Sequence, residues 1–149
     1  MTAHDYAELI DRLLTTCQYL DPDPHFTSEV KIPADNECAF EWKDTIHFRD
    51  GLRLEVTDYA IFAAGGGMVE RKFMYDLREK ITGRLIWRIC NHGAWKMVDE
   101  PCHVHADPDD PEKRLEIWPS SEDTTFAYVM HCLKNHYEQK PQEWETIAQ

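Results

Sequence analysis

Residues 85–105 gather side chains that can perform acid–base chemistry and bind phosphate. An apolar strand ends in Arg88, Asn91 and His92, and a short loop then leads into Cys102-His103-Val104-His105. Histidine titrates near neutral pH, so an imidazole can act as an acid, a base, a metal ligand or a phosphate partner. The segment therefore indicates a functional site.

Metal-independent cleavage of a phosphodiester in RNA is one chemistry that fits these residues. It needs a base for the 2′-hydroxyl, an acid for the leaving oxygen and a cation for the charge that develops at phosphorus. Two of His92, His103 and His105 could fill the proton roles. Arg88 suits phosphate because its planar guanidinium binds two oxygens at once. We predict a catalytic set that uses no metal and no cofactor: Arg88, His92, His103 and His105.

Four further residues are expected to bind the substrate. Lys72 offers an alternative cation and Tyr75 a hydroxyl donor, while an exposed Trp95 could stack on a base. Trp87 alternates with apolar residues and is expected to pack in the core instead. The predicted substrate-binding set is Lys72, Tyr75, Asn91 and Trp95.

Two other interpretations of the same segment stay open. The cysteines and histidines around residues 90–105 are acceptable zinc ligands, but no standard ligand spacing is present. Alternatively, histidine and asparagine side chains satisfy the backbone of a loop that crosses a sheet edge. The five histidines outside the segment are expected to have structural roles: His4, His25, His47, His131 and His136.

Composition narrows the class of protein. The chain has 149 residues, 42% hydrophobic residues and a net charge of −12, which disfavours nonspecific binding to nucleic acid or to an anionic membrane. No apolar run is long enough to cross a bilayer. The five cysteines form no C-x-x-C pair, which argues against a disulfide framework. We expect a cytoplasmic protein that is not inserted in a membrane.

The charge is distributed unevenly along the chain. Residues 61–97 contain seven basic and three acidic side chains, a balance of +4 inside a chain of −12. This basic segment could hold a phosphate-bearing ligand locally, although a solvated outer face of a sheet would show the same pattern.

Periodicity predicts the elements that position these residues. Apolar residues recur at helical spacing over residues 4–19, and a helix with a capped start is expected from residue 120 to Pro141. Between them the period is two, with strands around residues 38–43, 52–57, 69–77 and 84–91, and a short one at 114–118. Asp50-Gly51 is predicted to form a turn, and residues 63–67 a flexible connection.

Consecutive strands with short turns predict an antiparallel meander. The expected fold is a single α+β domain over residues 1–140, in which a sheet of four to six strands is flanked by N- and C-terminal helices that cover one face. Residues 141–149 are expected to form a polar C-terminal tail.

The order of these motifs resembles that of the TumE-like proteins, small bacterial and archaeal toxins of two-gene toxin–antitoxin pairs. The resemblance covers roughly residues 40–138. It consists of Asp50-Gly51, the strand with Phe73 and Tyr75, then Arg88 with Asn91 and His92, then Pro101 with His103 and His105, and a closing helix. Cys90 stands where the family favours an acid, Cys102 where a histidine is common, and Trp95 and Lys96 replace a second histidine–proline region.

The resemblance implies a toxin that acts on RNA, as an endoribonuclease, with a cognate antitoxin protein as its partner. The acidic flanks of the chain would attract a basic antitoxin. A non-catalytic module that binds a nucleotide or a protein partner is the alternative. An exposed edge strand of the meander could pair with a second copy and give a homodimer.

Overall fold

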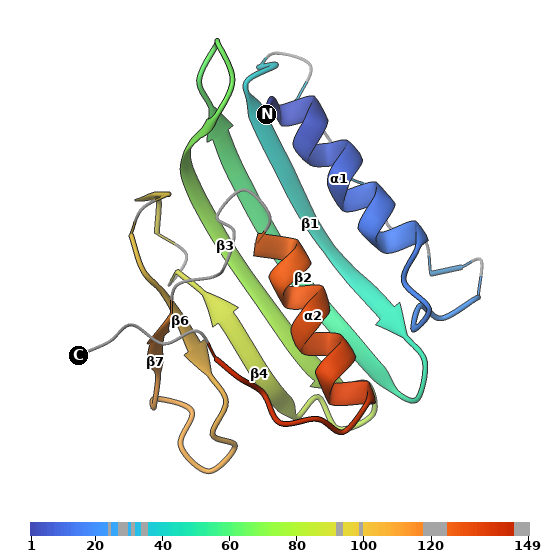
Figure 1. Cartoon of the computed structure of the whole chain (residues 1–149). Coiled ribbons are helices and arrows are strands. Elements are labelled where there is room, and N and C mark those ends of the chain that lie inside the picture. The colour runs from blue at the N-terminus through green and yellow to red at the C-terminus, as the bar shows by residue number, and fades with distance from the viewer. Residues whose placement is uncertain are drawn as a thin grey trace.

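The predicted fold class is confirmed. The structure is a computed structural model that describes residues 1–23, 25–26, 30, 32–33, 36–91, 94–98, 100–117 and 125–144. An N-terminal helix α1 (Ala3–Thr15) and a C-terminal helix α2 (Thr125–Tyr137) enclose a run of strands along the chain (Figure 1). The strands are β1 (Ala39–Phe48), β2 (Leu52–Phe62), β3 (Met68–Glu79), β4 (Leu85–Cys90), β5 (Lys96–Met97), β6 (Cys102–His105) and β7 (Leu115–Ile117).

All the described strand pairs are antiparallel, and the sheet follows the meander order β1-β2-β3-β4-β6-β7. The predicted strands account for β1 to β4 and β7, and the structure adds two more: β6, which pairs with β4 and β7, and β5, which is only two residues long and pairs with β3 beyond the end of β4. A strand that short produces no periodicity that a sequence could reveal. The predicted short strand at 114–118 is present as β7, although residue 118 lies outside the described part.

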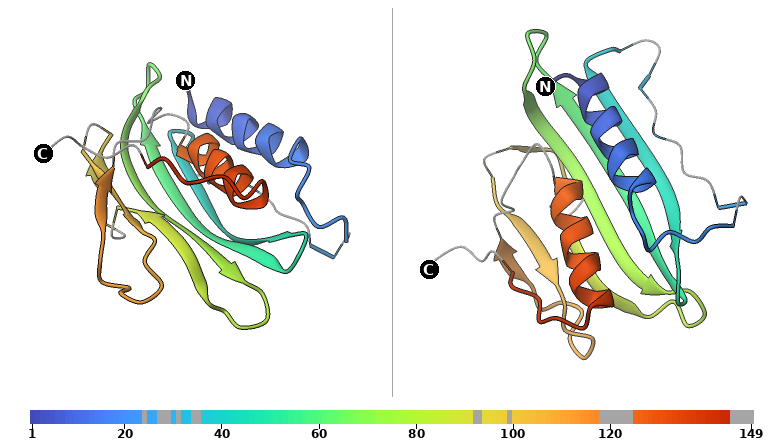
Figure 2. Two further views of the ribbon diagram at one scale, coloured as in Figure 1. Left: turned by 60° about the horizontal axis from the view of Figure 1, so that its bottom comes forward. Right: turned by 45° about the vertical axis from the view of Figure 1, so that its right-hand side comes forward.

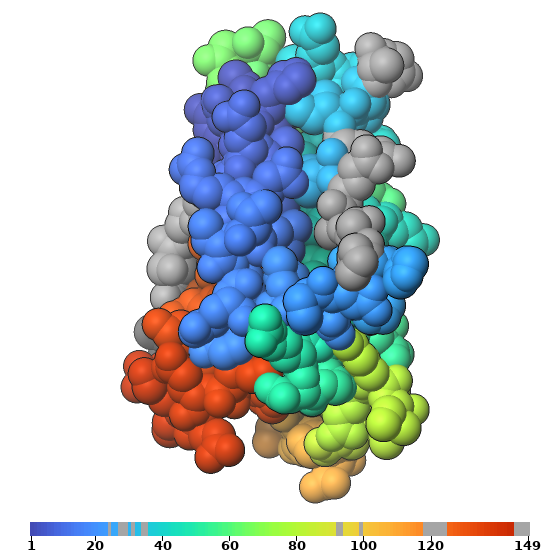
Figure 3. Space-filling view, turned by 90° about the vertical axis from the view of Figure 1, so that its right-hand side faces the viewer, coloured from blue at the N-terminus to red at the C-terminus, as the bar shows by residue number. Residues whose placement is uncertain are grey.

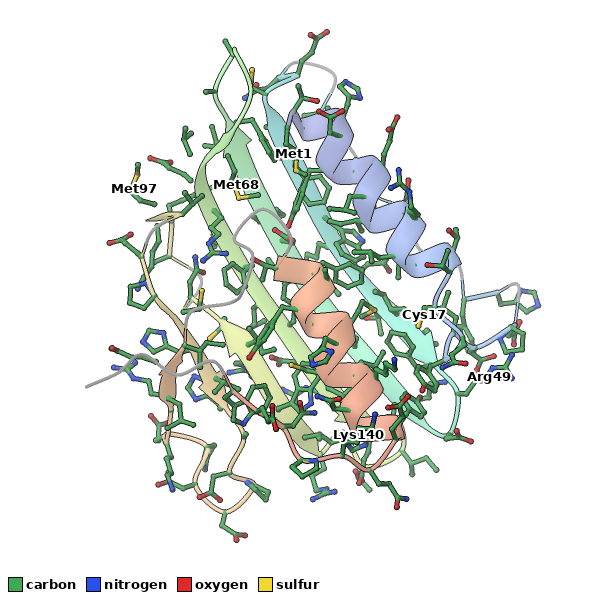
Figure 4. All side chains as sticks on the ribbon, viewed as in Figure 1. Met1, Cys17, Arg49, Met68, Met97 and Lys140 are labelled. Carbon is green, nitrogen blue, oxygen red and sulfur yellow. The ribbon has the colours of Figure 1, made fainter. Side chains whose placement is uncertain are left out.

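Both helices lie on the same face of the curved sheet, side by side in its hollow (Figure 2). We call this the covered face and the opposite one the open face. Tyr6 of α1 packs edge-on against Phe40 of β1, and Phe126 of α2 packs against Trp42 and Tyr75. Figure 4 shows side chains filling the space between the helices and the sheet. The apolar core therefore lies between the two layers, as the alternation in the strands predicts.

Helix α1 ends four residues earlier than its apolar periodicity predicts. Its start is fixed by a capping box in which Thr2 and Asp5 exchange hydrogen bonds. Near its end, the hydroxyls of Thr15 and Thr16 both donate to the carbonyl oxygen of Arg12. Threonine side chains that bond to the helix backbone compete with its ladder, which accounts for the early end. The predicted capped start of the second helix lies outside the described residues.

The turn between β1 and β2 depends on Gly51. In the three-residue loop between Phe48 and Leu52, Asp50 and Gly51 have φ values of 61° and 77°, a left-handed conformation that glycine adopts without a steric cost. Gly51→Ala is therefore expected to lower the free energy of unfolding by about 1 kcal/mol, because an L side chain is strained in that region. Gly65→Ala is the matched control, since Gly65 has no positive φ and no atom within 4 Å of an added Cβ. Urea titration of both variants measures the difference, and equal stability would contradict the prediction.

Candidate functional site on the open face

Arg88 and His105 lie directly opposite each other on β4 and β6 of the open face. On the other side of Arg88, Asp76 of β3 is its direct partner, and Glu55 of β2 is the partner of Asp76. Directly opposite residues of an antiparallel pair have Cβ atoms about 5 Å apart. One row across four strands thus contains an acid, a second acid, an arginine and a histidine.

The guanidinium of Arg88 is held as a fork on Asp76. Its Nε and Nη2 atoms donate to the two carboxylate oxygens of Asp76 at 2.6 and 2.7 Å. Asp76 is only 1% exposed, whereas the Arg88 side chain is 32% exposed. The hydrogen bonds from the guanidinium to Asp76 raise the pKa of Arg88 above its usual value, so the group stays cationic. Arg88 is therefore a fixed positive charge that is still accessible from the open face.

Further ion pairs continue this arrangement away from His105. Arg78 donates to Asp76 at 3.0 Å and to Glu55 at 3.2 Å, and Arg53 donates to Glu55 at 3.3 Å. We call Arg53, Glu55, Arg78, Asp76 and Arg88 the ion-pair ladder. It contains three cations and two anions, so the ladder carries a net charge of +1 within an acidic chain.

A second row runs beside the first. His103 of β6 lies directly opposite Cys90 of β4 on one side and Glu116 of β7 on the other. Cys90 and His103 are buried, and Nε2 of His103 is 3.9 Å from a carboxylate oxygen of Glu116, a contact that is an ion pair only when the ring is protonated. His103 is thus placed next to a carboxylate, two residues from His105.

The ring of His105 has a defined orientation. Its Nδ1 atom lies 3.1 Å from the carbonyl oxygen of Pro111 in the β6–β7 connection. A carbonyl oxygen only accepts, so Nδ1 carries the proton and Nε2 is the nitrogen that can take one up. A small pocket of about 90 Å³ next to this ring is lined by His105, Arg84, Ile86, Ala106, Pro108 and Pro111, among others.

The period of two explains why these side chains share the open face. In β4, Trp87 and Ile89 are buried on the covered face, so Arg88 and Cys90 must face the other way. In β6, Val104 is buried on the covered face between His103 and His105. Arg88, His103 and His105 of the predicted catalytic set are brought together in this way.

The other predicted site residues are distributed differently. Lys72 lies on the open face of β3, four residues before Asp76. Trp95 is 47% exposed in the connection after β4, at the opposite end of that strand from residue 85. His92 lies outside the described residues.

Tyr75 and Asn91 are not available on the open face. Tyr75 is fully buried on the covered face, where its hydroxyl donates to Asp58. Asn91 is 1% exposed, and its amide accepts from the backbone N–H of Phe73 and donates to the carbonyl oxygen of Arg71, both at 3.0 Å. The Asn91 side chain therefore ties the end of β4 to β3, so the structure assigns it a local structural contact.

A buried polar network on the covered face was not expected from the sequence. The carboxylate of Asp58 on β2 accepts hydrogen bonds from the hydroxyls of Tyr6, at 2.8 Å, and Tyr75. Burial raises the pKa of the Asp58 carboxyl to about 6, although the two hydroxyls and nearby Arg71 act in the opposite direction. A signal was present: Asp58 follows Leu54 and Val56 at a position of β2 that faces the core.

Arg71 extends this network toward the start of α2. It is 3% exposed, and its two Nη atoms donate to Oγ1 of Thr125, at 2.6 Å, and to Sγ of Cys102, at 3.0 Å. Its guanidinium also lies 4.8 Å from the ring centroid of Phe73. Part of the basic segment 61–97 is therefore directed into the core and does not contribute to an exposed cationic surface.

Within the described ranges, no group of three or more histidine, cysteine, aspartate or glutamate residues is arranged to hold a metal ion. Neither of the two described helices has the length and apolar character that spanning a membrane requires.

Comparison with family models, with curated proteins and with solved structures finds no match to this chain. The resemblance to the TumE-like proteins thus stays a prediction.

Proposed function

We propose that the protein is a toxin of the TumE-like kind that acts on RNA in the cytoplasm as a metal-independent endoribonuclease. The observation that carries the proposal is the direct pairing of Arg88 with His105 across β4 and β6, with His103 in the next row of the same face. A fixed cation and two imidazoles are the groups that this reaction needs.

The roles follow from the surroundings of each ring. His105 is the base, because Nδ1 already carries a proton toward Pro111 and Nε2 can accept one. His103 is the acid, because the neighbouring carboxylate of Glu116 pairs with its protonated ring. Alternate residues of a strand are about 6.6 Å apart, a span that allows the two rings to lie on opposite sides of one phosphate.

The proposed step conserves atoms and protons. His105 takes the proton of the 2′-hydroxyl, and the 2′-oxygen forms a bond to phosphorus. The bond between phosphorus and the 5′-oxygen then breaks, and His103 gives its proton to that oxygen. Arg88 stabilises the extra negative charge on the phosphate oxygens, leaving a 2′,3′-cyclic phosphate and a 5′-hydroxyl as products.

One observation favours a second candidate, a non-catalytic module that binds a nucleotide or a protein partner. Nδ1 of His103 and Nε2 of His105 are both shielded from solvent. A substrate would reach these two nitrogen atoms only after a local rearrangement, whereas the guanidinium of Arg88 is already accessible. Saturable, salt-sensitive binding of RNA without turnover would identify such a module.

Two protein partners are part of the proposal. A basic antitoxin would be attracted to the acidic segments that flank residues 61–97. In the described sheet, β1 and β7 end the order of strands, so pairing of one such edge with a second copy would give a homodimer.

The test is expression of the wild type, His105→Ala and His131→Ala from a tightly repressed promoter in bacteria, with growth and total RNA integrity recorded. We expect growth arrest with RNA fragmentation for the wild type and for His131→Ala, whose histidine is exposed on α2. His105→Ala should lose both effects, because removal of a general base costs at least roughly 100-fold in rate. Normal growth with intact RNA for the wild type would exclude the ribonuclease and favour the binding module.

A further inference from the structure

Three segments that are far apart in sequence meet at the end of the molecule where α2 finishes. They are the β3–β4 turn around Arg84, the β6–β7 connection that follows His105, and residues 138–144 after α2 (Figures 1 and 3). Lys140, labelled in Figure 4, stands at this end. The proposed site on β4 and β6 reaches the same end through His105.

A cleft of about 570 Å³ lies here, a volume in the range of sites for small molecules. We call it the α2-end cleft. Its lining includes Trp87, His136, Gln139, Lys140, Gln142 and Trp144. Residues 141–144 were expected to form a polar tail, but Trp144 packs edge-on against Trp87, with ring centroids 6.4 Å apart and planes at 79°. Trp144 is only partly buried, so the cleft has an indole wall that an aromatic ligand can reach.

Hydrogen-bonding groups accompany this wall. The amide of Gln142 is fixed by a bond from Nε2 to the carbonyl oxygen of Cys132 at 2.7 Å, which anchors the segment after α2. Trp87 is 2% exposed, and its indole Nε1 has no hydrogen-bond partner among the described residues. This nitrogen is enclosed by the surrounding protein, so it is not a contact for a ligand in the cleft.

The charges around the cleft suit a nucleotide. Lys140 lines the cleft and Arg84 lines the small pocket beside His105. Both side chains are exposed, each in a surface ion pair with a glutamate. Exposed pairs of this kind contribute little, so a phosphate can compete for the cations. Burial and the nearby charge of Arg84 lower the pKa of His136, which keeps that imidazole neutral at pH 7 and able to both donate and accept.

The cleft adjoins the small pocket beside His105, because Ile86 and Ala106 line both. We propose that the α2-end cleft binds one unpaired nucleobase of single-stranded RNA, stacked on Trp144, with the adjacent phosphate directed toward His105. The assignment of His105 as the destination of the phosphate rests on the proposed function. A base in a duplex is paired and stacked on its neighbours, so only a single strand can place one in the cleft.

The test uses binding, which requires no turnover. A fluorescein-labelled single-stranded 2′-O-methyl RNA, which cannot be cleaved through a 2′-hydroxyl, is titrated with the wild type, Trp144→Ala and Trp144→Leu, and a duplex of the same sequence serves as competitor. We expect both variants to weaken binding roughly 10- to 100-fold, the range for loss of one base–aromatic stack. Trp144→Leu retains an apolar contact for Trp87, so it separates lost stacking from lost folding.

Phe26→Ala is the matched control, since Phe26 is also an exposed aromatic residue but stacks on His47 and lines neither the cleft nor the small pocket. Its affinity should match that of the wild type, and the duplex should compete poorly. Equal binding by the Trp144 variants, or competition by the duplex as strong as by the single strand, would overturn the assignment. If the protein binds the single strand through Trp144 but cleaves no RNA, the result would support the α2-end cleft as a nucleobase site and would contradict the proposed ribonuclease activity. If the Trp144 variants cleave RNA as fast as the wild type, the result would contradict the nucleobase site in the cleft and leave the proposed ribonuclease activity intact.

Discussion

Arg88→Lys is expected to lower the rate of RNA cleavage at least about 100-fold, or about 2.7 kcal/mol of transition-state stabilisation. Lysine keeps the positive charge but presents a single nitrogen in place of a planar fork, so it cannot bind Asp76 through two parallel bonds and also offer a second pair of donors to a phosphate. Asp76 holds the guanidinium of Arg88 through two short bonds. The variant thus tests the geometry of the cation and leaves the net charge unchanged.

Arg78→Lys is the control for this measurement. Arg78 binds the same carboxylate of Asp76 and lies in the same ion-pair ladder, but its other partners are Glu55 and the backbone of the β3–β4 turn. It has no register contact with β6, so its replacement should change cleavage by less than about 3-fold. Initial rates on a defined single-stranded RNA compare the two variants. An equal loss in both would attribute the effect to the ladder as a structural unit, and full activity of Arg88→Lys would remove Arg88 from the mechanism.

The second large effect concerns stability and pH. The pKa of Asp58 is about 6 in the folded chain, against an ordinary value of 3.8. Between these values the folded chain binds more protons than the unfolded chain, so the free energy of unfolding falls as the pH rises through this interval. The cost of ionising Asp58 in the core is present in full above the folded pKa. A shift of two pKa units corresponds to about 3 kcal/mol in the free energy of unfolding. About 1 kcal/mol of this is regained when the pH is lowered from about 7 to 5, because Asp58 becomes protonated in the folded chain.

The measurement is the difference in the free energy of unfolding between the wild type and Asp58→Asn, from urea titrations at about pH 7 and pH 5. A difference is needed because burial lowers the pKa values of His47 and His136, which destabilises the fold on acidification in both proteins. We expect the wild type to gain about 1 kcal/mol relative to Asp58→Asn over this interval. A difference that is independent of pH would contradict the raised pKa.

Asp5→Asn is the control for this measurement, because the pKa of Asp5 is shifted in the direction opposite to that of Asp58. Hydrogen bonds from the backbone and hydroxyl of Thr2 lower the pKa of the exposed Asp5 carboxyl. Its contribution to stability is present above its ordinary pKa and is lost only at lower pH, so the difference between wild type and Asp5→Asn should stay constant between about pH 7 and pH 5.

Alternation along single strands was enough to predict which side chains share a face. Arg88 lies between Trp87 and Ile89, so its place on the open face follows from the sequence. The same argument applies to Tyr75, which alternates in phase with Phe73 and Leu77 and so belongs with the core. The predicted substrate-binding set combined Tyr75 with Lys72. These residues are three positions apart in β3, so they point to opposite faces of the sheet, and the structure places Tyr75 on the covered face and Lys72 on the open face.

Contacts between strands could not be predicted in the same way. The pairing of Arg88 with His105 depends on the register of β4 and β6, which are joined by a connection that includes β5. No turn motif of fixed length sets that register. The hydrogen bond from Tyr6 to Asp58 joins positions 52 residues apart, and the α2-end cleft needs the chain after Pro141 to pack back onto Trp87. Such contacts arise from tertiary packing, which local periodicity does not encode.

The position of α2 in the chain has a consequence for biosynthesis. Its first residues, Thr125 and Phe126, bind Arg71 and pack on Trp42 and Tyr75, so they complete a core whose strands precede them. A ribosome makes the sheet first, and a nascent chain that lacks α2 leaves the covered face of β3 without its layer. Domains fold as units once their core is available, so this one folds only after residue 137 has left the exit tunnel. The apolar face of the nascent sheet is the surface that a chaperone would recognise during that interval.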